Sequence, residues 1–81
     1  MSAWAFNPGE FHRRLCQAWY HSGLTMLETA KRVKRSRKSI ERYMSGESMP
    51  DARTLAELCA VFKVSADWML YGEGGRPEWW T

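Results

Sequence analysis

The sequence predicts an all-α fold of five short helices, and three observations lead to this fold class. Residues that favour helix starts (Asn, Thr, Ser and Asp) precede five segments whose apolar side chains recur at three- and four-residue spacing. Glycine follows three of these segments as a helix stop. No segment alternates polar and apolar residues as a strand would. With 81 residues, of which 44% are hydrophobic, the chain is expected to form one small folded domain.

Two helices are predicted in the first part of the chain. Asn7 and Pro8 are an N-cap and a first helical residue, and they open a helix to about residue 21 that stops at Gly23. Thr25 and Glu28 form a capping-box pattern, which opens a second helix to about residue 33. The spacing places the following residues on the buried stripes of the two helices: Phe11, Leu15, Ala18 and Trp19, then Leu27, Ala30 and Val33.

Three further helices are predicted after residue 35. Ser36 caps a helix over residues 37–45 that stops at Gly46, Asp51 opens a fourth helix, and Ser65 caps a short last helix that ends at Gly72. We expect a helix-turn-helix domain over residues 7–72, with aromatic-containing terminal segments at residues 1–6 and 73–81. The apolar residues expected to face the core are Ile40, Tyr43, Met44, Leu55, Leu58, Cys59, Phe62, Trp68 and Met69.

Positive charge is concentrated in one short part of the chain. Residues 31–42 hold seven of the 12 basic residues and one of the nine acidic residues, so the remainder of the chain is net acidic. A local cationic block in an otherwise acidic domain indicates a polyanionic partner and a defined docking face. The alternative is that these lysines and arginines only solvate an exposed helix.

The basic block coincides with two short helices joined by about three residues, which is the spacing of a helix-turn-helix. In that motif the second helix enters the major groove of DNA. Arginine suits this position because its planar guanidinium can bond both major-groove acceptors of guanine. Since Ile40, Tyr43 and Met44 must face the core, four side chains of residues 37–45 are left pointing outward: Arg37, Lys38, Glu41 and Arg42.

Glu41 has two interpretations. It lies within one helical turn of Arg37 and Lys38 and can neutralise their charges. Alternatively, its carboxylate can accept a hydrogen bond from the amino group of cytosine.

The chain also resembles a known family, the Cro and phage-repressor type of helix-turn-helix, over about residues 11–72. It reads GLTM at residues 23–26, has a small residue at Ala30, and continues as SRKSIERYMSG at residues 36–46 with Pro50 shortly after. The segment VSADWMLYGEG at residues 64–74 is similar to the closing helix of small phage repressors. The resemblance implies a five-helix, lambda-repressor-like fold and binding to double-stranded DNA.

By position, the resemblance places the base-reading residues at Arg37, Lys38 and Arg42. It places phosphate-binding residues at Thr25, Met26, Ser36, Ser39 and Ser45. The charges of Lys31, Arg32, Lys34 and Arg35 are expected to add attraction to phosphates.

The chain departs from the family pattern at three positions. Met26 replaces a glutamine that reaches DNA, so a polar side-chain contact there is lost or becomes a backbone contact. Lys34 replaces the turn glycine, and it must either adopt a left-handed conformation or form a different turn. Arg35 replaces a buried apolar residue; its stem can cover the core while its charged end reaches a phosphate.

A single reading helix contacts only a few base pairs, so we expect a homodimer on a palindromic operator. Four aromatic residues lie outside the helices: Trp4, Phe6, Trp79 and Trp80. They can fold back onto the core of their own chain, form a dimer contact, or remain exposed. The candidate dimer or tail contacts are Tyr71, Trp79 and Trp80.

The expected function is a sequence-specific regulator of transcription, of the phage or prophage repressor or Cro-like kind. The alternative is an antitoxin or another protein-interaction module in which DNA binding is secondary. RNA binding is disfavoured because the basic block holds no aromatic stacking platform. An enzyme is disfavoured because neither histidine lies beside a plausible nucleophile and there is no glycine-rich phosphate loop.

No cofactor or metal is expected. Cys16 and Cys59 lie in separate helices among apolar neighbours and are read as buried thiols, with a disulfide or a metal role as alternatives. His12 and Cys16, one helical turn apart, could form half of a metal site, but no second pair accompanies them. The sequence contains no apolar run of membrane-spanning length and no signal-peptide pattern at its start, so we expect a protein of the bacterial cytoplasm with no membrane partner.

Overall fold

Five α-helices follow one another along the chain, with short turns between them. The computed structural model describes residues 6–80, and in this range it contains no strand. The fold class and the order of the elements agree with the prediction. The helices are α1 (Pro8–Ser22), α2 (Met26–Val33), α3 (Arg37–Ser45), α4 (Ala52–Phe62) and α5 (Ala66–Tyr71).

Each helix begins and ends in the same way. A side-chain oxygen at every N-cap accepts a hydrogen bond from the backbone N–H three residues later, which stabilises each helix by about 1 kcal/mol. Every C-cap residue is left-handed. Glycine takes this conformation at no steric cost, but two of the five C-caps are lysines, Lys34 and Lys63. The N-caps are Asn7, Thr25, Ser36, Asp51 and Ser65.

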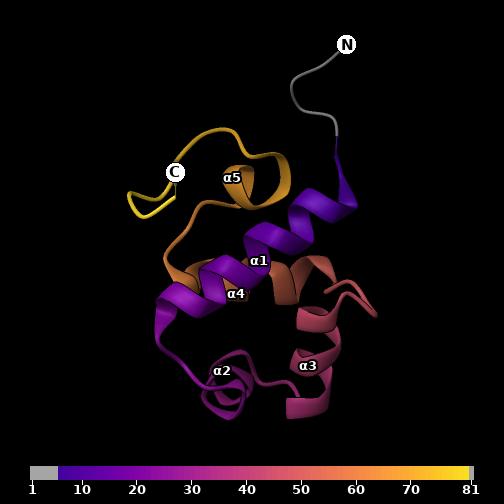
Figure 1. The fold of residues 1–81 in the computed structure, drawn as a ribbon. Coiled ribbons are helices and arrows are strands. Elements are labelled where there is room, and N and C mark those ends of the chain that lie inside the picture. The colour runs from indigo at the N-terminus through magenta and orange to yellow at the C-terminus, as the bar shows by residue number, and fades with distance from the viewer. Residues whose placement is uncertain (1–5, 81) are drawn as a thin grey trace.

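The helices α1 and α4 cross in the middle of the molecule, with α2 and α3 on one side and α5 on the other (Figure 1). Trp68, Ile40 and Leu58, from three different helices, are fully buried between them. No helix within residues 6–80 combines the length and the apolar character needed to cross a membrane. The buried apolar residues are Phe11, Leu15, Ala18, Ala30, Val33, Ile40, Met44, Leu58, Cys59, Phe62, Trp68 and Met69.

One predicted core residue is not buried. Leu27 is 49% exposed, so this prediction was wrong. The buried stripe of α2 runs instead through Met26, Thr29, Ala30 and Val33, with Met26 partly and the others fully buried. These residues follow the three- and four-residue spacing of one helix face, whereas Leu27 lies about 100° around the helix from Met26.

The last turn of α3 is attached to α1 by hydrogen bonds. His12 Nε2 and Cys16 Sγ on α1 both donate to the carbonyl oxygen of Met44, at 2.7 and 3.2 Å. A carbonyl in the last turn of a helix has no partner within that helix, so these bonds satisfy it. They also fix where α3 lies on the body of the molecule.

Candidate DNA-binding surface

The turn between α2 and α3 is formed by a lysine in a conformation that usually requires glycine. Lys34 has φ 56° and ψ 46°, which is left-handed, and the backbone N–H of Arg35 donates to the carbonyl of Ala30 at 3.0 Å. The first of the two possibilities expected for Lys34 is therefore confirmed. A left-handed conformation costs a residue with a Cβ about 1–2 kcal/mol. The left-handed turn places the cationic side chain of Lys34 at the junction of the two helices.

Arg35 joins this turn to the start of α4. Its Nε donates to the hydroxyl of Thr54 at 2.8 Å, and its NH2 lies 3.2 Å from Oδ2 of Asp51. Hydrogen bonds from the hydroxyl and N–H of Thr54, and to a lesser extent the charges of Arg35 and Arg53, lower the pKa of Asp51. The charged end of Arg35 is therefore held by the protein itself, and a DNA phosphate there has to compete with Asp51.

The two faces of α3 differ as the sequence analysis expected. Ile40 and Met44 are buried and Tyr43 is partly buried. The opposite face exposes the four predicted side chains, Arg37, Lys38, Glu41 and Arg42. The structure thus brings the three predicted base-reading residues together on one solvent-facing surface.

The charges at the start of α3 are opposite to those that stabilise a helix. The first turn contains Arg37 and Lys38 and no acidic residue, whereas the first turns of α1 and α2 contain Glu10 and Glu28. The helix macrodipole disfavours each such cation by about 0.3–1 kcal/mol. The first turn of α4 also contains an arginine and no acidic residue. The feature of α3 that suits an anionic partner is therefore the group of exposed cations on one face.

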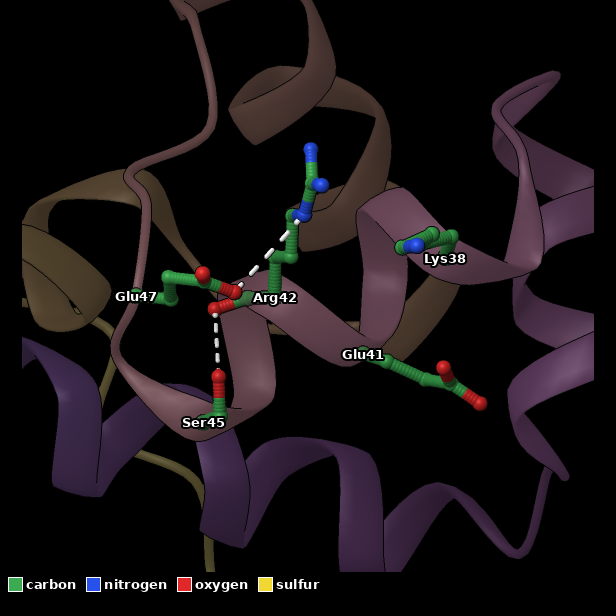
Figure 2. Close-up of a pocket in the computed structure, with 5 residues that line it drawn as sticks. All are labelled: Lys38, Glu41, Arg42, Ser45 and Glu47. Atoms are coloured by element: carbon green, nitrogen blue, oxygen red, sulfur yellow. Dashed lines mark hydrogen bonds and ion pairs between the residues drawn. The ribbon is translucent and has the colours of Figure 1, made fainter.

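Two arginines on this face are paired with carboxylates. Arg37 Nε lies 3.1 Å from Oε2 of Glu41, and Arg42 Nε lies 3.6 Å from Oε2 of Glu47. A shallow hollow lies between these carboxylates, and Figure 2 shows Glu47 reaching back to Arg42 while Glu41 extends away from it. The hollow is lined by Lys38, Glu41, Arg42, Ser45 and Glu47.

Sequence reasoning did not single out Glu47, because this residue follows the end of α3. The signal was Gly46, whose left-handed conformation turns the chain back. As a result the N–H of Glu47 donates to the carbonyl of Arg42 at 3.0 Å, and the carboxylate returns beside the helix.

The predicted phosphate-binding hydroxyls are engaged in local hydrogen bonds. Ser36 accepts from the N–H of Ser39 at 3.1 Å, and their hydroxyls lie 3.0 Å apart. Ser45 donates to the carbonyl of Arg42 at 3.1 Å. Thr25 accepts from the N–H of Glu28 at 3.1 Å. The first N–H groups of α2 and α3 have no partner within their helices, and they are the donors that a helix start offers to an anion.

The helix-turn-helix geometry agrees with a comparison of the sequence with known protein families. The family model described as "Helix-turn-helix domain" matches residues 13–75. The chain belongs to this helix-turn-helix family. The resemblance to Cro and phage repressors is thereby confirmed, and the five-helix arrangement is consistent with a lambda-repressor-like fold. The search of curated proteins and the search of solved structures returned no significant match.

Membership of the helix-turn-helix family gives the broad functional class of the protein. The helix-turn-helix is a DNA-binding domain of transcription regulators, and the family is not an enzyme family. This agrees with the sequence analysis, which found no catalytic arrangement.

The C-terminal segment of this helix-turn-helix protein folds back onto its own core. Trp79 and Trp80 contact Trp68 edge to face, with ring centroids 5.6 and 5.2 Å away. His21 stacks on Trp79 at 4.2 Å, and the guanidinium carbon of Arg13 lies 5.0 Å from the ring centroid of Trp80. The first of the three expected arrangements is confirmed for these two tryptophans.

The other aromatic candidates differ in position. Phe6 is 43% exposed, and its ring centroid lies 5.8 Å from the ring centroid of Phe11. Tyr71 is partly buried at the end of α5. Trp4 lies outside the described residues.

Both cysteines of the helix-turn-helix domain are free thiols. Burial raises the pKa of Cys59 to about 11 and also raises the pKa of Cys16. His12 and Cys16 do lie close, with Nε2 and Sγ 3.5 Å apart, but both contact Met44. Residues 6–80 contain no cluster of three or more His, Cys, Asp or Glu that could hold a metal ion.

Proposed function

We propose that the protein is a sequence-specific, double-stranded DNA-binding regulator of transcription, of the phage or prophage repressor or Cro-like kind. The supporting observation is the sorting of α3, which exposes Arg37, Lys38 and Arg42 while Ile40 and Met44 anchor its other face. The helix dipole disfavours the cations at the start of α3, and their positive charge suits the anionic surface of DNA.

In this proposal the three exposed cations of α3 read base edges, and Arg37 and Arg42 are best suited to guanine. The phosphate contacts fix the register of the protein on the duplex but carry no sequence information. Lys31 and Arg32, both exposed on α2, add attraction that is independent of sequence. The phosphate contacts are assigned to Thr25, Ser36, Ser39, Ser45, Lys34, Arg35 and the backbone of Met26.

Two protomers are proposed to bind a palindromic operator, because one reading helix contacts too few base pairs for specificity. Trp79 and Trp80 are engaged with Trp68 of the same chain, so the proposed dimer does not depend on exchanging the tail. This packing counts against an antitoxin-like module that binds its partner through the aromatic tail, but not against one that uses its helices.

Selection of DNA from a random library with the purified protein tests this function. We expect a palindromic motif whose half-sites are about 10 base pairs apart, with guanine at positions facing Arg37 or Arg42. Binding to that motif is expected to weaken steeply with salt. If no motif is enriched and binding does not depend on salt, the regulator function fails and the protein-interaction alternative gains support.

A further inference from the structure

Each outward arginine of α3 is bound by a carboxylate from its own segment of the chain. In both pairs the nitrogen nearest the carboxylate is Nε: Arg37 with Glu41 at 3.1 Å, and Arg42 with Glu47 at 3.6 Å. Lys38, between the two pairs, has no ion pair within the described residues. The carboxylates thus orient the side chains of Arg37 and Arg42, whereas no carboxylate in the described part of the chain orients the side chain of Lys38.

Contact through Nε has a chemical consequence. A guanidinium carries five N–H donors, one on Nε and four on the two terminal nitrogens. A carboxylate on Nε leaves the terminal pair available, and this pair can bond O6 and N7 of guanine together. The carboxylate also restricts rotation about the end of the side chain, so less conformational freedom is lost when the base is bound.

Stability does not explain these pairs. The Arg37 and Glu41 side chains are 64% and 48% exposed, and those of Arg42 and Glu47 are 51% and 67% exposed. Ion pairs this exposed contribute little to folding. Two carboxylates beside a surface that meets phosphates also oppose binding, because they repel the DNA backbone.

We propose that Glu41 and Glu47 are specificity-determining residues that position Arg37 and Arg42 to read guanine. This inference rests on the proposed function. The carboxylates lower affinity for every DNA sequence and raise the preference for guanine opposite each arginine. Glu41 has the larger effect, because its pair is shorter and its carboxylate side chain is less exposed than that of Glu47. The contact favours the neutralising interpretation of Glu41 over direct bonding to cytosine.

A double-mutant cycle on Arg37 and Glu41 tests the inference. Affinities are measured for the selected operator, for operators with the guanine opposite Arg37 replaced, and for random DNA. Glu41→Ala is expected to raise affinity for random DNA about two- to threefold and to lower the guanine preference several-fold. In the Arg37→Ala background, Glu41→Ala is expected to leave the base preference unchanged. Glu41→Gln, which keeps an acceptor oxygen, is expected to lose less preference than Glu41→Ala.

The chain offers a matched control on α4. Arg53 and Glu57 are also an i,i+4 arginine–glutamate ion pair, with Nε and Oε1 3.1 Å apart. Glu57→Ala removes the same charge and is expected to leave the base preference intact.

Two results overturn the inference. The first is a guanine preference that survives Glu41→Ala unchanged. The second is a change in base preference on Glu41→Ala that persists without Arg37, which means that Glu41 contacts a base directly. A wild-type protein with no base preference at all removes the proposed function and the inference together, so the two failures can be told apart.

Discussion

Arg35, in the turn between α2 and α3, donates a 2.8 Å hydrogen bond from Nε to the hydroxyl of Thr54 on α4. Thr54 is 1% exposed, so loss of this donor leaves its hydroxyl buried without that partner. We expect Arg35→Ala to destabilise the fold by about 1–2 kcal/mol in urea unfolding.

Thr54→Val provides the partner variant for this bond. It removes the hydroxyl, together with the bond from that hydroxyl to Asp51, but keeps the N–H that donates to Asp51 at 2.8 Å and caps α4. If the contact is formed in solution, the double variant loses less stability than the sum of the two single losses. Fully additive losses would contradict the contact.

Arg14 is expected to be the most important charged residue for stability. Its side chain lies in the core at 6% exposure, and it donates to the carbonyls of Met69 and Leu70 at 2.9 and 3.0 Å, which ties α1 to the end of α5. Arg14→Ala is expected to cost about 2–4 kcal/mol in urea unfolding, since charged hydrogen bonds and packing are lost together. Arg13→Ala, at the exposed neighbouring position, is the control and is expected to cost at most about 1 kcal/mol.

Two capping carboxylates should make the fold sensitive to acid. The backbone N–H of Thr25 lowers the pKa of Glu28, and the hydroxyl and N–H of Thr54 lower the pKa of Asp51. A carboxyl with a lowered pKa in the folded state stabilises the fold above its ordinary pKa, and this contribution is lost as pH falls through the lowered value.

Thermal unfolding from about pH 5 to about pH 2 checks this sensitivity. The double variant Glu28→Gln, Asp51→Asn is expected to lose less stability over that interval than the wild type. An identical loss in both proteins would show that these caps do not carry the acid response.

The aromatic tail is expected to contribute to stability rather than to association. The ring centroid of Trp80 lies 5.2 Å from that of Trp68 and 5.0 Å from the guanidinium carbon of Arg13. We expect Trp80→Ala to cost about 2–3 kcal/mol, less than for a fully buried tryptophan because Trp80 is only partly buried. Analytical ultracentrifugation of the variant should match the wild type. Unchanged stability with a lower association constant would instead assign the tail to the dimer.

Cys59 is expected to be chemically inert in the folded protein. Burial raises the pKa of its thiol to about 11, so very little thiolate is present near neutral pH. Alkylation followed by mass spectrometry should label Cys59 only after unfolding in urea. Rapid labelling of the folded protein would contradict the buried position.

The helix boundaries could be predicted because their signals are local. Thr25, Ser36 and Gly46 each act on backbone groups within a few residues, so their effect can be read from adjacent sequence. Helix periodicity likewise identified the outward face of α3. It misplaced Leu27, because α2 is only eight residues long and two overlapping stripes fit so short a pattern.

The long-range contacts of basic residues could not be predicted. Arg14 bonds to residues 55 and 56 positions away in sequence, and Arg35 bonds to Thr54, 19 positions away. The family pattern marks the position of Arg35 as usually buried, but no local pattern identifies the groups that Arg14 and Arg35 contact, whereas Arg37 and Arg42 remain exposed. The roles of the arginines depend on which carbonyls and carboxylates the fold brings near them.

In the proposed function Arg37 reads a base, whereas Lys31 only attracts phosphates. The most direct test compares Arg37→Ala with Lys31→Ala on the selected operator and on random DNA over a range of salt concentrations. Arg37→Ala is predicted to cost about 1–3 kcal/mol on the operator and far less on random DNA, whereas Lys31→Ala weakens both alike and flattens the salt dependence. Equal losses on both DNAs for Arg37→Ala would show that Arg37 does not read a base.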